Sequence, residues 1–273
     1  MSESLTLEKL ISYKDANKDI LEELRKFANN MNFKVKPKRN IGNKKESFEN
    51  KTSWILDKKI HEDKNEKIYM EIRLILNRLA DDNIKELAEE LINININKKI
   101  HMEKLAEFIF LKATNEQKFC DLYSKLSKEL VSYYIIDNSI EGKKEIFFRE
   151  LLITRCQIAF NKCFSNSDQL MTKEKILGCI IFIGTLYNNF LLTNGIINSC
   201  FSILFIKISS SEYVIDSICT LMKIVGKKFC QKAPQESQIC FEKMEKLKDS
   251  SDISKKDKFM IMDLLDLKKD ENW

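Results

Sequence analysis

The feature that most constrains this chain is residues 176–206, which contain no charged side chain although 32% of all residues are charged. Polar residues between Asn188 and Gly195 interrupt this stretch. A single membrane-spanning helix would need about 20 predominantly apolar residues, and no second span or aromatic belt accompanies this one. We therefore expect no membrane partner but two buried helices, 173–190 and 193–207, which form an antiparallel hairpin covered on both sides by the rest of the fold.

Turn-forming residues are rare, with only two prolines and six glycines among 273 residues. No Asn-Gly or Asp-Gly pair separates two alternating apolar runs, so sheets are poorly supported and the fold class is predicted to be all-α. Apolar residues at helical spacing predict consecutive helix pairs. The expected pairs are 65–79 with a helix capped by Asp81 or Asp82 that carries Ile84 to Ile92, 99–113 with 116–133, 143–164 with 173–190, 193–207 with 212–229, and 236–247 with 254–267. About five antiparallel pairs with a repeat of about 40 residues indicate a HEAT-like solenoid.

Two segments precede the predicted solenoid domain, 64–273: an amphipathic segment, 1–30, and a basic linker, 31–63. The amphipathic segment either folds on a partner or docks on the main domain as an extra helix. Residues 34–59 carry nine Lys or Arg against three acidic residues, and this net charge of +6 exceeds the +5 of the whole chain. Such a linker suits contact with a phosphate backbone or an acidic protein face, and the alternative is a solvated tether. The candidate RNA-binding residues are Lys34, Lys36, Lys38, Arg39, Lys44 and Lys45.

The basic linker also contains the large aromatic residue Trp54, although its other residues are mostly charged or polar. Exposing the large side chain of Trp54 to water is unfavourable, so it either packs back on the domain or anchors a pocket of a partner.

The residues that usually carry chemistry do not form a recognisable motif. Phosphate-loop, dinucleotide-binding, zinc-protease and nucleophile-elbow motifs are absent, and His61 and His101 lie in charged contexts where we expect exposure. Cys156 and Cys163 share one predicted helix face, where core thiols are expected rather than metal ligands. We predict a binding scaffold without enzymatic activity, metal or cofactor.

The cysteines also indicate the cellular compartment in which the protein is expected. There are eight, with no Cys-x-x-Cys pair, and most lie within apolar helical patterns. In the absence of a signal peptide, we expect reduced, buried thiols in a cytoplasmic, monomeric protein.

Three segments together resemble the middle domain of eukaryotic translation initiation factor 4 gamma. They are residues 72–94 followed by 105–130, residues 147–160, and residues 177–193 joined with 259–273. The specific features are Phe148-Arg149, Arg155-Cys156-Gln157, and the closing Leu265-Asp266-Leu267 with Trp273.

The resemblance implies a HEAT-repeat domain that binds the DEAD-box helicase of the complex, initiation factor 4A, and holds its two lobes in a productive arrangement. It also implies contacts with messenger RNA and other initiation factors. The residues it associates with helicase binding are Trp54, Leu56, Phe148, Arg149 and Arg155. For Phe148 a core position is a strong alternative, because Leu151 and Leu152 lie on the same apolar face, and Arg155 either pairs internally or faces a partner.

The resemblance also gives the N-terminus a role. The family binds the cap-binding protein, initiation factor 4E, through Tyr-x-x-x-x-Leu-apolar, and Leu5, Leu10 and Ile11 have this spacing, followed by Tyr13. Leu5 stands in the place of the tyrosine, which removes the hydroxyl hydrogen bond. Two alternatives stay open: a paralogous scaffold in messenger-RNA decay, splicing or translational repression, and an RNA-binding protein without a helicase partner.

Overall fold

The structure is a computed structural model that describes residues 65–94, 96–137, 144–164, 171–208 and 213–273. Several predicted site residues lie outside them: Leu5, Leu10, Ile11, Tyr13, Lys34, Lys36, Lys38, Arg39, Lys44, Lys45, Trp54 and Leu56.

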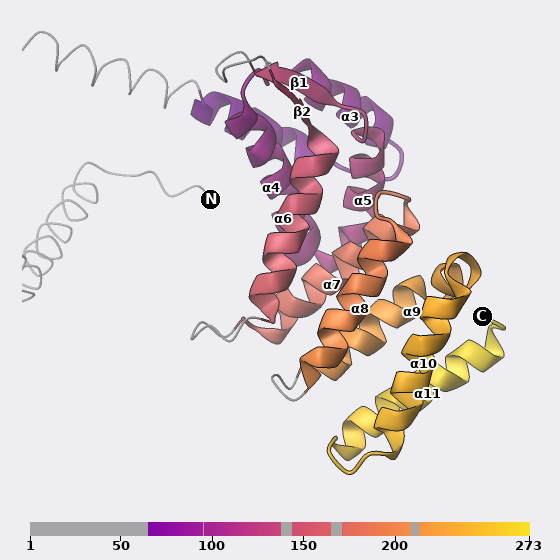
Figure 1. The fold of residues 1–273 in the computed structure, drawn as a ribbon. Helices are drawn as coiled ribbons and strands as arrows, with labels where there is room; N and C mark the ends of the chain where they lie inside the picture. The colour runs from indigo at the N-terminus through magenta and orange to yellow at the C-terminus, as the bar shows by residue number, and fades with distance from the viewer. Residues whose placement is uncertain (1–64, 95, 138–143, 165–170, 209–212) are drawn as a thin grey trace, which may run out of the picture. The chain divides into compact units, whose positions relative to one another are not determined.

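The described chain is a succession of helices joined by short connections (Figure 1). Residues 65–76 are helical. The other helices are α3 (Ile84–Asn93), α4 (Lys99–Asn115), α5 (Cys120–Glu129), α6 (Phe148–Cys163), α7 (Lys173–Asn188), α8 (Asn194–Ile206), α9 (Val214–Lys232), α10 (Pro234–Asp249) and α11 (Lys255–Asp270), with a short 3-10 helix, η2 (Gln117–Phe119), before α5. The predicted all-α solenoid of about five antiparallel pairs is confirmed.

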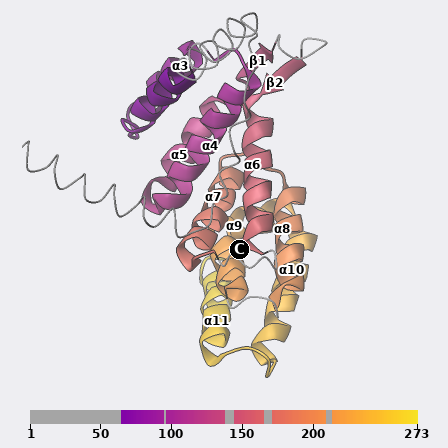
Figure 2. The same cartoon turned by 90° about the vertical axis from the view of Figure 1, so that its left-hand side faces the viewer.

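The helices form two layers (Figure 2). In the first, which we call the α7 layer, α3, α5, α7, α9 and α11 each pack on the next. The second, the α6 layer, contains the 65–76 helix, α4, α6, α8 and α10, and each of its four labelled helices packs on its successor in the chain. The hydrophobic core runs between the layers, and its largest fully buried side chains include Phe182, Phe201, Phe229 and Phe241.

The uncharged stretch forms α7 and α8, as expected. Ile180, Phe182 and Leu186 of α7 are buried, and so are Phe201 and Leu204 of α8. The two helices meet in a turn at residues 189–193. Across the described residues, none of the helices has the length and apolar character that a membrane span requires.

A small β-hairpin departs from the all-helical prediction. Strand β1 (Tyr134–Asp137) pairs antiparallel with β2 (Lys144–Phe147), so the expected helix at 143–164 begins only at Phe148. Side chains along β1 alternate between exposed and buried, the period of a half-buried strand rather than a helix. The hairpin also caps a helix, because the buried carboxylate of Asp137 accepts a hydrogen bond of 2.7 Å from the backbone N–H of Lys99 at the start of α4.

One glycine sets the separation between the layers. At Gly178 in α7, a methyl group would overlap with the backbone carbonyl of Thr114 at the end of α4. Because the obstacle is backbone within a helix, it cannot rotate away as a side chain could. Only glycine therefore allows α7 to approach α4 this closely.

We expect Gly178→Ala to destabilise the domain by about 1–3 kcal/mol, because the added methyl group forces α7 away from α4. The matched control is Gly195→Ala in the first turn of α8, where the nearest atom to the added carbon is 3.8 Å away. Alanine is the better helix former, so this control should leave stability unchanged or raise it by up to about 1 kcal/mol. Urea denaturation of both variants measures the difference, and equal effects would contradict the proposed close approach.

Candidate functional site

Three of the predicted helicase-binding residues lie in the described part of the chain, all on α6. Phe148 begins this helix and its side chain is fully buried, at 0% exposure. Its backbone N–H donates a hydrogen bond to the carbonyl of Tyr133, which joins α6 to the segment before the hairpin. The assignment of Phe148 is therefore corrected from a partner contact to a core residue, because its side chain offers no surface to a partner.

Arg149 is half-buried and forms a structural contact. Its Nε and Nη2 both donate to the carbonyl oxygen of Leu191, at 3.2 and 2.9 Å. Leu191 belongs to the turn between α7 and α8, so Arg149 fastens the start of α6 to that turn. Its contact with a helicase stays a prediction.

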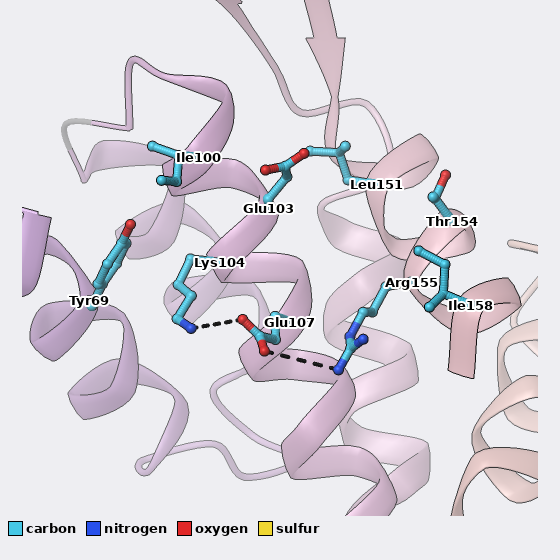
Figure 3. A pocket seen from close by; sticks show the side chains of 9 residues that line it. All are labelled: Tyr69, Ile100, Glu103, Lys104, Glu107, Leu151, Thr154, Arg155 and Ile158. Carbon is cyan, nitrogen blue, oxygen red and sulfur yellow. Dashed lines mark hydrogen bonds and ion pairs between the residues drawn. The ribbon is translucent and has the colours of Figure 1, made fainter. Parts of the chain in front are cut away.

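Arg155 lies where α6 faces α4 and the 65–76 helix. A pocket of about 440 Å³ opens there, which we call the α4–α6 pocket (Figure 3). The lining residues are Tyr69, Ile100, Glu103, Lys104, Glu107, Leu151, Thr154, Arg155 and Ile158. They come from three helices that are far apart in sequence.

A chain of charges crosses this pocket. The Lys104 ammonium lies 2.8 Å from one carboxylate oxygen of Glu107, and Nη2 of Arg155 lies 4.0 Å from the other. The Arg155 guanidinium also sits 5.1 Å from the centroid of the Phe110 ring. The Arg155 and Glu107 side chains each keep 34% exposure, so this loose pair stabilises the fold only weakly. Arg155 therefore pairs internally, while its contact with a partner stays a prediction.

The rim of the pocket is apolar. Ile100 is 53% exposed and Ile158 55%, so the pocket lining includes two large aliphatic side chains that are open to solvent. Exposed aliphatic side chains around a partly neutralised arginine are the composition of a protein-docking surface. Among the described residues, no group of three or more His, Cys, Asp or Glu could hold a metal ion.

A second cavity, of about 550 Å³, lies between α6 and α8. Its walls are mainly aliphatic and include the thiols of Cys156 and Cys200. Burial raises the pKa of Cys200 to about 12 and raises that of Cys156 further, so both thiols stay protonated and unreactive at neutral pH. The expected core placement of Cys156 and Cys163 is confirmed, and all eight cysteines are free.

His101 is buried at 3% exposure, which corrects the expectation that it is exposed. Lys98 and Lys99 give it a charged context in sequence, but His101 lies on the inner face of α4. Its Nε2 is 2.8 Å from Oδ1 of Asn65, and its ring packs edge-on against Tyr69. Burial, and secondarily Lys98, lowers the pKa of His101, and its Nδ1 has no hydrogen-bond partner among the described residues.

The fold defines a helical-repeat domain of paired helices in two layers. The chain matches the model of the MIF4G domain over residues 70–271, and it belongs to that family.

Proteins with similar sequences are translation factors. The chain is 26% identical over 279 residues to eukaryotic translation initiation factor 4 gamma of Dictyostelium discoideum, covering 82% of this chain and 20% of that protein. It is 27% identical to eukaryotic translation initiation factor 4G of Arabidopsis thaliana, covering 74% and 13%, and 24% identical to eukaryotic translation initiation factor 4 gamma 3 of Homo sapiens, covering 75% and 15%. The chain thus spans a fifth or less of the length of these curated relatives.

Among solved structures, the chain is similar to the crystal structure of the MIF4G domain of a Trypanosoma cruzi translation initiation factor. The TM-score is 0.48 at 20% identity, and the match covers 75% of this chain and 96% of that one.

The buried histidine predicts a pH dependence. A folded-state pKa below the unfolded value of about 6.5 means that protonation favours the unfolded chain, so this contribution is complete above that value and is lost as pH falls through about 6.5 toward the folded pKa. We expect His101→Gln to lose less stability than the wild type between about pH 7.5 and about pH 5.5. Thermal denaturation at both pH values measures the difference, and identical losses would show that His101 does not contribute.

Proposed function

We propose that this protein is a translation initiation scaffold that binds a DEAD-box helicase of the initiation factor 4A type through the α4–α6 pocket. The observation that carries the proposal is the MIF4G match over residues 70–271 together with the open, arginine-bearing pocket inside the matched region. The proposal extends to linkage of the helicase with the cap-binding protein, initiation factor 4E, and with messenger RNA through the segments before residue 65.

The geometry of the pocket suits a partner that brings both an apolar side chain and a carboxylate. Ile100 and Ile158 lose water when an apolar side chain packs between them. Nη2 of Arg155 is held only loosely by Glu107, at 4.0 Å, so a carboxylate of the partner can take up the guanidinium. Glu107 does not then lose its partner, because Lys104 stays bonded to it at 2.8 Å.

A scaffold of this kind acts by positioning rather than by chemistry. The α6 layer carries the pocket, while the α7 layer behind it holds α4 and α6 in place. A rigid surface loses little conformational freedom on binding, so more of the contact energy appears as affinity. This supports a role in holding the two lobes of a helicase at a set distance.

We expect Arg155→Met to weaken helicase binding by about tenfold or more, which corresponds to at least about 1.4 kcal/mol, because the guanidinium contact is lost while the apolar stem is kept. The matched control is Lys243→Met on α10, a cation that also lies 5.1 Å from an aromatic centroid, that of Phe205. Isothermal titration of both variants with purified helicase is the measurement. Equal affinities for the two variants would place the helicase elsewhere.

We expect Trp54→Ala to weaken helicase affinity by about 30-fold, or about 2 kcal/mol, without moving the denaturation midpoint. The physical reason is that a Lys-rich segment cannot bury this side chain locally, so a partner must. Truncating a core aromatic would instead cost about 3–5 kcal/mol of folding stability. A large fall in the midpoint with retained affinity would make Trp54 structural.

We expect Leu10→Ala combined with Ile11→Ala to abolish binding to the cap-binding protein and leave helicase binding intact, because the two sites lie on opposite sides of the basic linker. Titration of the double variant against each partner separately is the test. Weakening of both interactions to the same degree would indicate that the N-terminal segment belongs to the domain fold.

A further inference from the structure

The turn between α7 and α8 presents an aromatic side chain that the fold itself does not need. Phe190 is 70% exposed. Its φ is 68°, and among the described residues Asn272 is the only other non-glycine residue with a positive φ. A bulky residue in this left-handed region costs free energy that asparagine or glycine avoids.

The backbone of this turn is a regular helix ending. The N–H of Phe190 donates to the carbonyl of Tyr187, and the N–H of Leu191 donates to that of Leu186, both at 3.0 Å. This is the Schellman arrangement, in which the position that Phe190 occupies is usually glycine. Neither the backbone nor burial therefore accounts for a phenylalanine here; its ring contacts the Lys228 ammonium and leaves most of its surface to solvent.

The turn is held rigidly by side chains from three other helices. Arg149 of α6 donates twice to the carbonyl of Leu191. Asn189 donates to Ser124 of α5 at 3.0 Å. Lys228 of α9 donates to the carbonyls of Tyr187 and Asn188, at 2.8 and 3.1 Å. The ring is thus presented from a fixed backbone, which lowers the entropy cost of binding to it.

Two lysines lie near the ring. The ammonium of Lys228 lies 3.2 Å from the centroid of Phe190, and that of Lys128 lies 5.7 Å away. Lys232 adds a further positive charge, which with Lys128 and with burial as the main cause lowers the pKa of Lys228. In the part of the chain that the structure describes, none of these three lysines forms an ion pair. The neighbouring carboxylate of Asp121 is already bound by Lys125, at 2.8 Å.

We propose that Phe190, Lys128, Lys228 and Lys232 form a binding site for single-stranded RNA, in which a base stacks on Phe190 and phosphates contact the lysines. Lys228 uses two of its three N–H donors on carbonyls, which leaves one for a phosphate oxygen. Aromatic rings beside cationic side chains are the usual composition of single-strand binding surfaces.

A protein partner is less well supported by the same surface. Within residues 188–195, only Phe190 offers an exposed apolar side chain, because Leu191 and Leu192 are buried and the other residues are polar or glycine. A protein interface needs a contiguous apolar core, whereas an unpaired base needs only the open face of one ring. The positive charge without acidic partners also favours a phosphate backbone.

This inference deepens the RNA-binding part of the proposed function, and its test does not involve the helicase. The full chain is titrated with a fluorescent single-stranded oligouridylate of about eight nucleotides, a length within the usual site size of such surfaces. We expect Phe190→Leu and Phe190→Gly to weaken binding by about fivefold or more, because both remove the stacking ring, and Phe190→Trp to preserve it. The matched control is Phe119→Ala, which truncates another half-exposed phenylalanine, at the opposite end of α5 from Lys128.

Two further measurements separate the RNA site from misfolding and from charge alone. Phe190→Gly should raise the thermal midpoint, because glycine adopts the positive φ without strain, so reduced RNA binding would not reflect a loss of fold. Lys128→Gln should reduce the salt dependence of binding by about one unit of slope.

The oligouridylate titrations test the RNA site separately from helicase binding. Unchanged oligouridylate affinity in Phe190→Leu and Phe190→Gly would overturn the proposal. If those variants lose only helicase affinity, the turn is a protein-docking surface and the RNA proposal is wrong. Loss of RNA affinity in a chain that shows no helicase binding would instead support this site and contradict the proposed scaffold function.

Discussion

The structure depends on the burial from both sides of one helix, α7, which has no charged residue after Lys175. α7 packs against α4, α5, α6 and α9, so almost no part of its surface is left for charged side chains. Glycine is present at two points where another helix crosses it: Gly178 faces the Thr114 carbonyl of α4, and Gly184 faces the Ile224 side chain of α9. A helix satisfies its backbone hydrogen bonds internally, and this allows complete burial without a polar surface. The remaining helices are arranged around this one.

A single buried carboxylate ties the second half of the domain to α7. The Asp216 side chain in α9 is only 5% exposed and pairs with Lys173 at the start of α7 and with Lys256 of α11, the latter at 3.8 Å. An apolar residue could pack in its place, but it would not select one alignment of three helices. Removing Lys173 would leave the nearly buried Asp216 carboxylate poorly compensated, which is destabilising, whereas the more exposed Lys256 contributes less. The ion pairs therefore fix the register of α7, α9 and α11, while apolar packing supplies most of the stability.

Much of the fold could be predicted from the sequence because helical periodicity is local. The helix expected at 99–113 is Lys99–Asn115, and that expected at 173–190 is Lys173–Asn188. The β-hairpin was missed because four-residue strands give little periodic signal and depend on a partner strand. The site was only partly predictable for a related reason. α6 is covered by α4 on one side and α7 on another, so its apolar residues surround the helix, and spacing alone cannot separate buried Phe148 from exposed Ile158. The pairing of Arg155 with Glu107 joins two helices, and no sequence pattern connects them.

The middle of the α7 layer differs from the α6 layer in what it leaves exposed, whereas α3 and α11 at its ends expose Ile92, Phe259 and Met262. The α5, α7 and α9 helices, all fully described, have no exposed large hydrophobic residue within their bounds. In contrast, α4, α6, α8 and α10 of the α6 layer each have at least one, including Ile100, Ile158, Ile203 and Ile239. Each helix in the middle of the α7 layer has a neighbour on both sides as well as the other layer against it, whereas α6 packs closely on α4 and leaves a cavity toward α8. Exposed side chains of the α6 layer can therefore be substituted without disturbing the packing that holds the domain together, a separation of surface from core that a repeat architecture allows.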